Sequence, residues 1–247
     1  MTESDARMVS NGMGDIQAFG HQNGPVIAVD GPSGSGKSTA ARSVALALGL
    51  RYLDTGSMYR ALTWWMLAHG VPVTDPAAIL ARLNEPAISV GTDPATPQIL
   101  VDGKDVANQI REREVSNTVS FVAAVPQVRQ VLVGMQRQII AAAAHDIGIV
   151  AEGRDIGTVV APGAAIKVFL TASEEIRAMR RSAELSADPA ATVDATRQEQ
   201  ALRDMRDAAQ MVMAPDAVEL DTSELGLDEV VARIIDMAKN LGLVGHG

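Results

Sequence analysis

The chain has 247 residues, of which 47% are hydrophobic, and a formal net charge of −9. Its length and hydrophobic content suffice for one α/β core with a small inserted lobe. The absence of cysteine excludes disulfides and thiolate zinc sites and fits a reducing cytoplasm, while the acidic balance argues against a nucleic-acid partner. No hydrophobic run approaches the roughly 18 to 20 residues that span a bilayer, so we expect no membrane partner.

Residues 1–24 contain Gly, Asn, Asp and Ser without periodicity and lack the hydrophobic centre of a signal peptide. We interpret this segment as a disordered leader or a by-product of expression. Residues 25–240 then form a single domain.

A phosphate-binding loop comes directly after the first predicted strand. Residues 31–38, GPSGSGKS, fit the pattern G-x-x-x-x-G-K-[ST] at every fixed position, between a buried strand at 26–29 and a helix at 39–48. Its amides and the helix N-terminus would cradle phosphates, Lys37 would reach the β- and γ-phosphates, and Ser38 would hold Mg²⁺. The alternative is an ordinary glycine-rich turn with an exposed lysine. The predicted nucleotide-binding residues are Gly31, Pro32, Ser33, Gly34, Ser35, Gly36, Lys37, Ser38 and Thr39.

Strands and helices alternate beyond the loop. We expect strands at 51–53, 147–151, 166–170 and 218–220, and helices that end near 69 or span 112–122, 126–144, 174–184, 192–209 and 228–240. Asp75 would cap a short helix through 83. Three short strands at 88–90, 99–101 and 105–106, with a turn at Asp102-Gly103, interrupt the alternation. This pattern predicts an α/β fold with a parallel sheet, helices on both of its faces, and a small antiparallel inserted lobe.

The class of phosphate-loop protein is narrowed by the sequence on the C-terminal side of the loop. No N-K-x-D segment is present, which disfavours a GTPase, and the chain is too compact for a motor or transporter ATPase. Arginines recur at the expected ends of strands and helices, where they could stabilise the charge of a transferring phosphoryl group. These are Arg60, Arg111, Arg129, Arg154, Arg177, Arg180, Arg181, Arg203 and Arg206.

Four segments together resemble the bacterial cytidylate kinases, a family of phosphate-loop nucleoside monophosphate kinases. They are VDGPSGSGKS at 29–38, LDTGSMYRA at 53–61, EGRDIGTVV at 152–160 and IKVFLTAS at 166–173. The resemblance runs from about residue 25 to 240. It implies ATP-dependent phosphorylation of CMP and dCMP with Mg²⁺ in the cytoplasm, a nucleotide-binding lobe at about 70–125, and a lid at about 173–210. We expect a monomer.

The resemblance also implies how cytosine is read. A site that selects cytosine needs an acceptor for its amino group beside a donor for N3 and O2. In the family pattern these groups fall on Asp155 and Ser120 on the amino side and on Arg129 on the acceptor side. Uracil would leave buried polar groups mismatched, which can reject a wrong substrate strongly.

Further roles are implied residue by residue. Thr55, Arg60 and Arg154 match contacts to the acceptor phosphate, and Tyr59 matches a residue of the nucleotide pocket. Arg177, Arg180 and Arg181 match the mobile lid that closes over ATP. The catalytic set is Lys37, Arg154, Asp155 and Arg180. The candidates for contacts to the ribose depend on the alignment with the family motif. One register aligns Arg203 and Asp207 with the family's Arg–Asp pair and puts Gln210 where the family has an arginine. A shifted register begins the motif at Arg206 instead.

Several alternatives stay open. The three lid arginines could form a solvated helix face that pairs with Glu174, Glu175 and Glu184. Glu152 could orient other side chains or help to order Mg²⁺, and Arg111 and Arg113 are interpreted as surface charges. Two rival functions remain: a kinase for UMP or shikimate, and a module that binds nucleotide without catalysis.

Overall fold

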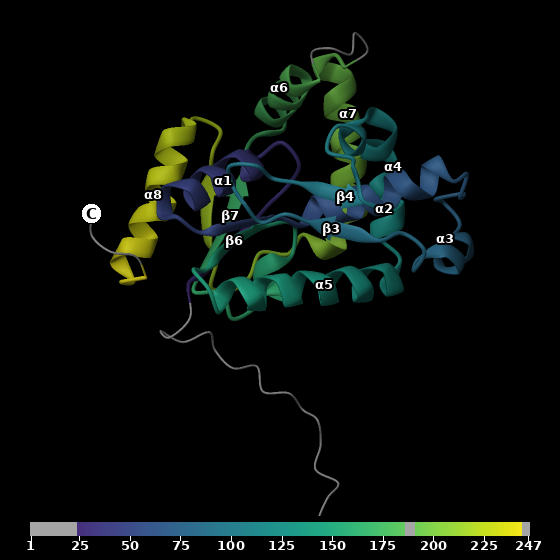
Figure 1. The fold of residues 1–247 in the computed structure, drawn as a ribbon. Coiled ribbons are helices and arrows are strands. Elements are labelled where there is room, and N and C mark those ends of the chain that lie inside the picture. The colour runs from purple at the N-terminus through teal and green to yellow at the C-terminus, as the bar shows by residue number, and fades with distance from the viewer. Residues whose placement is uncertain (1–23, 186–190, 244–247) are drawn as a thin grey trace, which may run out of the picture.

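The computed structural model describes residues 24–185 and 191–243. At its centre lies a five-stranded parallel sheet with the strand order β2-β6-β1-β7-β8 (Figure 1). The strands are β1 (Val26–Asp30), β2 (Arg51–Asp54), β6 (Ile149–Glu152), β7 (Ile166–Thr171) and β8 (Val218–Asp221). The register pairs Asp54 with Glu152 and Asp30 with Phe169, so the carboxyl ends of these strands meet at one edge. The predicted parallel sheet is confirmed.

Helices cover both faces of this sheet because its central strands are hydrophobic on both sides. Along β1, Ile27 and Val29 pack in one cluster with α1 (Lys37–Leu48) and α8 (Leu227–Asn240). Val26 and Ala28 point the other way, into a cluster with helices α2 and α5. Those helices are α2 (Thr55–Ala68) and α5 (Pro126–Ala144). This arrangement confirms the prediction of helices on two faces.

A second, antiparallel sheet has the order β3-β4-β5. Its turn residues Asp102 and Gly103 have φ angles of 52° and 77°, which suit a tight hairpin turn. The Asp75 carboxylate accepts a hydrogen bond of 2.9 Å from the backbone N–H of Ala77, the predicted helix cap. The elements of this region are α3 (Pro76–Arg82), β3 (Ile88–Val90), β4 (Ile99–Val101), β5 (Lys104–Asp105), η1 (Gln109–Arg111) and α4 (Arg113–Ala123).

Two further helices stand above the sheet edge, at the top of Figure 1. Helix α6 (Glu174–Glu184) and helix α7 (Val193–Asp207) pack chiefly against each other, and α7 also contacts α4. A short 3₁₀ turn, η3 (Ala208–Gln210), continues α7. Part of the predicted lid, residues 186–190, and most of the predicted leader lie outside the described residues.

The element boundaries differ from the predictions where glycine or a short irregular helix intervenes. Helix α1 begins at Lys37, two residues early, because Gly36 adopts the left-handed conformation at its N-cap. Strand β6 begins at Ile149 rather than at 147, after Gly148 with φ 93°. Its end leads into a five-residue π-helix, η2 (Ile156–Val160), which no sequence pattern predicted.

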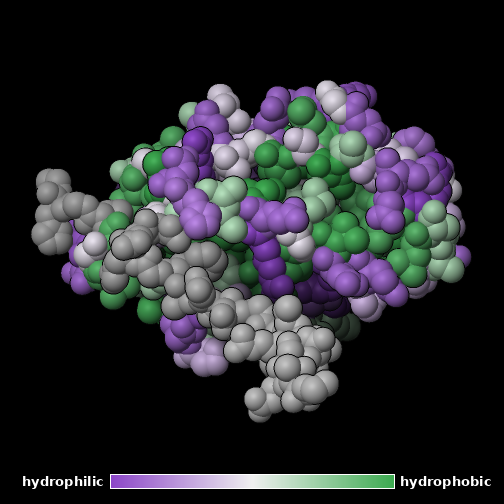
Figure 2. Space-filling model, turned by 60° about the horizontal axis from the view of Figure 1, so that its bottom comes forward, coloured by the Kyte–Doolittle hydropathy of each residue, from purple (hydrophilic) through white to green (hydrophobic). Residues whose placement is uncertain are grey.

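Figure 2 turns the face that carries α5 toward the viewer, and its hydrophobic areas are interrupted by hydrophilic side chains. Within residues 24–185 and 191–243, no single helix is long and hydrophobic enough to span a membrane; α4 and α5 would be so only together, and they are bent by 101° relative to each other.

Candidate active site

A cavity of about 510 Å³ opens at the carboxyl ends of β1, β2 and β6. Its wall combines the phosphate-binding loop, the antiparallel region and the ends of α6 and α7. Most of the predicted site residues line it: Ser33, Gly34, Gly36, Lys37, Ser38, Thr39, Thr55, Tyr59, Arg60, Ser120, Arg129, Arg154, Asp155, Arg181, Arg203 and Asp207. Residues far apart in the sequence therefore form one site.

The phosphate-binding loop has the backbone shape that its sequence predicts. Gly31 has φ 142°, and a Cβ atom there would lie 2.1 Å from the carbonyl oxygen of Leu170, so only glycine fits between β1 and β7. The Lys37 ammonium donates a hydrogen bond of 2.7 Å to the carbonyl of Pro32 and is held across the loop. Because α1 starts at this point, its N-terminal amides add to a site suited to anions.

A buried carboxylate lies behind the loop. Glu152, at the end of β6, is 3% exposed and accepts a hydrogen bond of 2.9 Å from the Tyr52 hydroxyl. Burial and the nearby charge of Asp54 raise the pKa of Glu152 to about 7, and the charge of Lys37 counteracts part of that rise. Glu152 and Ser38, the predicted Mg²⁺ ligand, line the same cavity. Burial and the charge of Arg154 lower the pKa of Lys37 to about 8.

The residues predicted to read the base also meet at this cavity. Arg129 on α5 forms an ion pair with Asp155, which follows β6 and is almost fully buried. Ser120 on α4 lines the same cavity, and its buried hydroxyl has no hydrogen-bond partner among the described residues. A carboxylate acceptor, a guanidinium donor and a hydroxyl that lacks a partner therefore share one largely buried wall, which favours a polar ligand.

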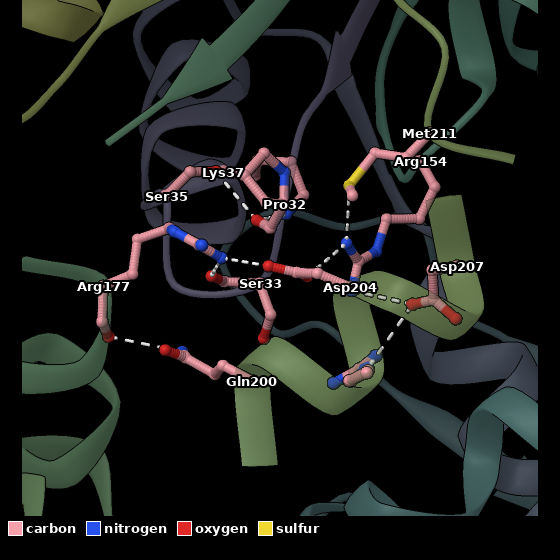
Figure 3. A network of polar contacts seen from close by, with 11 residues as sticks. Pro32, Ser33, Ser35, Lys37, Arg154, Arg177, Gln200, Asp204, Asp207 and Met211 are labelled. Carbon is pink, nitrogen blue, oxygen red and sulfur yellow. Dashed lines mark hydrogen bonds and ion pairs between the residues drawn. The ribbon is translucent and has the colours of Figure 1, made fainter. Parts of the chain in front are cut away.

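A cluster of arginines, Arg60, Arg154, Arg181 and Arg203, lines the same cavity. Burial, followed by the charge of Arg181, lowers the pKa of Arg60 to about 10. Burial and the charges of Arg60 and Arg154 lower the pKa of Arg203 well below its usual value. Arg154 is held 3.0 Å from Asp207 and 3.4 Å from Asp204 (Figure 3). Mutually repelling cations gathered in one cavity create a strong potential for an anionic ligand.

The remaining predicted residues lie at the border of the cavity or outside its wall. Arg177, 7% exposed, donates 3.2 Å to the carbonyl of Ser33 and pairs with Asp204, as Figure 3 shows. Arg180 donates to the hydroxyl and carbonyl oxygens of Thr222, at 2.9 and 2.7 Å, behind the phosphate-binding loop. Gly31, Pro32, Ser35 and Arg206 are also absent from the wall, and the Arg206 guanidinium stacks 4.4 Å above the Phe121 ring.

Of the pairs expected if the three lid arginines formed a solvated helix face, the structure shows one among the described residues, between Arg181 and Glu184. Arg181 pairs with Glu184 at 2.8 Å, and it also donates 3.1 Å to the hydroxyl of Ser116 on α4. Arg177 and Arg180 instead bond to Ser33, Asp204 and Thr222. Arg113 pairs with Glu199, away from the cavity wall.

Sequence reasoning assigned no site role to three parts of the wall. Arg111, interpreted as a surface charge, lines the cavity, as does Gln210 at the end of η3. The segment 91–98 between β3 and β4 also borders it, and Arg42 on α1 holds this segment by hydrogen bonds to the carbonyls of Pro94 and Ala95 at 2.6 and 2.9 Å. No local pattern connects Arg42 to a turn 52 residues away, so only the folded chain reveals this contact.

The fold and the cavity define a phosphate-loop kinase, an enzyme that transfers phosphoryl groups. The family model described as cytidylate kinase matches residues 27–240. The chain is 50% identical over 215 residues to a cytidylate kinase of Streptomyces coelicolor and 49% identical over 218 residues to one of Streptomyces avermitilis, in both cases covering 87% of this chain and 92% of the relative. A cytidylate kinase of Rhodococcus jostii is 47% identical, with 85% of this chain and 93% of that one covered. The chain belongs to the cytidylate kinase family.

Among solved structures, a shikimate kinase from Acinetobacter baumannii covers 89% of this chain and 96% of its own, at 15% identity and a TM-score of 0.43. A likeness of this size bears on neither substrate nor mechanism.

Proposed function

We propose that the protein transfers the γ-phosphoryl group of ATP to CMP or dCMP, which gives ADP and the corresponding diphosphate. The observation that carries the proposal is the convergence of three parts on one cavity: a phosphate-binding loop, a central cluster of arginines, and the Arg129–Asp155 pair with Ser120 on the same wall. Family membership supports the same activity.

In this proposal the acceptor lies between the arginine cluster and the base-reading pair. Asp155 accepts from the cytosine amino group, and Arg129 donates to N3 and O2. Arg60 and Arg154 bind the phosphate of CMP, and Thr55 supports that region because its hydroxyl donates 2.7 Å to the carbonyl of Glu152. A base that lacks an amino donor would leave one buried oxygen of Asp155 without a donor, because Arg129 pairs with the other, and this is costly.

The chemical step needs no covalent intermediate on the enzyme. An oxygen of the CMP phosphate attacks the γ-phosphorus of ATP, the bond from that phosphorus to the β–γ bridging oxygen breaks, and ADP leaves. Lys37 and the loop amides stabilise the negative charge that develops on the phosphates, and the arginines bring the two anionic substrates together. Positioning and electrostatics thus account for the catalysis.

Mg²⁺, which neutralises charge between the β- and γ-phosphates when it is bound, fits the residues present. Ser38 supplies a hydroxyl at the first turn of α1, and the buried Glu152 carboxylate lines the same cavity. Among the described residues no group of three or more His, Asp or Glu side chains could hold a metal alone. The ion would therefore be held jointly by the protein and the nucleotide.

We further propose a cytoplasmic monomer, because all the groups assigned to the site come from one chain and ATP is the co-substrate. Size-exclusion chromatography with light scattering tests the oligomeric state.

The test of function is ADP release measured with CMP, dCMP, UMP, AMP and shikimate as acceptors at one ATP concentration. We expect kcat/KM for CMP or dCMP to exceed that for each other acceptor by at least ~10-fold, the scale of ~1.4 kcal/mol. A preference for UMP or shikimate would replace the proposed substrate. ATP binding without turnover on any acceptor would indicate a binding module instead.

A further inference from the structure

A buried carboxylate outside the predicted site joins the phosphate-binding loop to the base-reading segment. Asp30 is the last residue of β1, directly before Gly31, and is 6% exposed. Its Oδ1 accepts a hydrogen bond of 2.8 Å from the backbone N–H of Ile156, and its Oδ2 accepts one of 2.8 Å from that of Gly157. Both oxygens are therefore committed to one turn of another segment, 126 and 127 residues away.

The segment that Asp30 holds is the one that carries the base-reading group. Ile156 and Gly157 open the π-helix η2, directly after Arg154 and Asp155. A backbone fixed at two consecutive amides leaves little freedom to the residue immediately before them. The direction in which Asp155 leaves the main chain toward Arg129 is thus set by the position of the Asp30 carboxylate.

The fit at this contact is close. A Cβ atom on Gly157 would lie 3.4 Å from Asp30 Oδ2 and 3.2 Å from Cδ of Lys167, and the second distance is shorter than side chains ordinarily approach. A side chain at Gly157 would thus be crowded by Lys167, whereas its contact with the Asp30 carboxylate would be of ordinary length.

Only an ionised carboxylate fits this arrangement well. Asparagine offers one acceptor oxygen and would direct its NH₂ group at the second N–H, so one buried amide would lose its partner. The carboxylate is retained although its position is unfavourable: burial, which outweighs the two amide hydrogen bonds, raises the pKa of Asp30 to about 6, and the charge of Asp155 adds to the rise.

We infer that Asp30 is a positioning residue that aligns Asp155 with respect to the phosphate-binding loop and thereby contributes to the choice of cytosine. This inference rests on the proposed function. Asp30 is not among the residues that line the cavity, so we expect it to act through the turn at 156–157.

The test compares Asp30→Asn with the wild type through the CMP/UMP ratio of kcat/KM. We expect the ratio to fall at least ~10-fold, while the Kd of a non-hydrolysable ATP analogue changes less than ~3-fold. In an Asp155→Asn background, the additional loss of ratio from Asp30→Asn should be below ~2-fold, because the group through which Asp30 acts is already changed. A purely structural defect would instead lower the rates with both acceptors equally, in both backgrounds, and would overturn the inference.

Asp216→Asn is the matched control. Asp216 is an exposed carboxylate that pairs at 2.7 Å with Lys167, whose side chain borders Gly157. Its replacement removes a charged partner near the same turn without touching the amides of Ile156 and Gly157. The CMP/UMP ratio of this variant should stay within ~2-fold of the wild type.

If Asp30→Asn does not fold, Asp30→Glu carries the same test, because its longer side chain displaces the carboxylate relative to the amides of Ile156 and Gly157. If the variant that folds keeps the wild-type CMP/UMP ratio of kcat/KM, the inference about Asp30 is overturned and the proposed function stays intact. A wild-type enzyme without preference for CMP over UMP refutes the base selection on which both proposals rest, and does so before any variant is compared.

Discussion

The polar groups at the strand ends and those on α6 and α7 are held in different ways. At the strand ends, Asp30 is fixed by backbone amides and Glu152 by Tyr52, so their geometry is built into the sheet. On α6, Arg177 pairs with Asp204 of α7, and Arg180 with Thr222. The first group is positioned by the core, whereas the second is held by side-chain contacts of helices that rest mainly on each other.

This difference separates what must stay fixed from what can move. Reading a base requires donors and acceptors at constant positions, because a displaced hydrogen bond no longer discriminates. A lid, in contrast, must release nucleotide, and side-chain ion pairs can be exchanged for contacts with phosphate. We therefore expect substitutions at the strand ends to alter chemistry and selectivity, and those on α6 and α7 to have effects that depend on whether the residue faces the cavity.

The largest effect is expected at Lys37, where the strand-end region meets the phosphates. Lys37→Ala should lower kcat at least ~100-fold, about 2.7 kcal/mol of barrier, because the loop loses its only charged side chain. The far-ultraviolet circular dichroism spectrum and Tm should stay close to those of the wild type. Retention of more than about a tenth of wild-type turnover would contradict the role of Lys37.

A smaller and more selective loss is expected at the arginines beside the acceptor. Arg60→Ala and Arg154→Ala should lower kcat/KM for CMP by about 100-fold and change the Kd of an ATP analogue less than ~3-fold, because both are proposed to bind the acceptor phosphate. Arg60→Ala is the cleaner variant, since Arg154→Ala also removes a partner of Asp204 and Asp207. Equal losses for both ligands would indicate structural damage or a role at the donor site.

Base choice is expected to relax in Asp155→Asn. The amide can donate to O4 of uracil while Arg129 still meets O2, so CMP turnover should fall and the CMP/UMP ratio of kcat/KM should drop ~10- to 100-fold, or ~1–3 kcal/mol. Steady-state kinetics with both acceptors measures the ratio. If both activities are lost with the ratio unchanged, Asp155 has a catalytic or structural role, and base reading must be assigned to Ser120 and Arg129.

The strand-end part of the site could be predicted from sequence because its geometry depends on local rules. The glycine pattern dictates the loop conformation, and parallel strands bring their carboxyl ends to one edge. The Arg129–Asp155 pair was expected from the family resemblance, and the structure brings the two residues together.

The parts that could not be predicted depend on contacts between distant elements. Arginines on α6 recur at helical spacing, but which of them meets Asp204 or Thr222 is decided by how α6 packs. The acceptor of Arg42 lies in a turn of the antiparallel region. Asp30 stands at the start of a loop motif, and nothing near it in the sequence indicates its two amide partners. Packing, rather than propensity, determines these contacts.

A pH profile tests the charge of Lys37 in the strand-end region without a substitution. Burial and Arg154 lower the pKa of Lys37 to about 8, so above pH 8 the free enzyme loses the charge that attracts phosphate. We expect kcat/KM for ATP to fall by about tenfold between pH 8 and pH 9.5, since this parameter reports ionisations of the free enzyme. In Lys37→Arg this decline should be absent. A wild-type profile that is flat to pH 9.5 would show that Lys37 keeps its proton.

The smallest effect is expected on the outer side of α7, and it distinguishes the two registers of the ribose contacts. Arg203 lines the cavity and lies 3.6 Å from Asp207, whereas Arg206, about one turn further along, stacks on Phe121 and is absent from the wall. Arg206→Gln should therefore change kcat/KM for CMP less than ~2-fold and lower stability by no more than ~1 kcal/mol, the scale of an exposed cation–π contact. Arg203→Gln, the matched variant, should lower kcat/KM for CMP at least ~10-fold, because it removes one of the cations that face the acceptor. If the two effects were reversed, the shifted register would be correct, and helix α7 would have to rotate to bring Arg206 into the cavity when CMP binds.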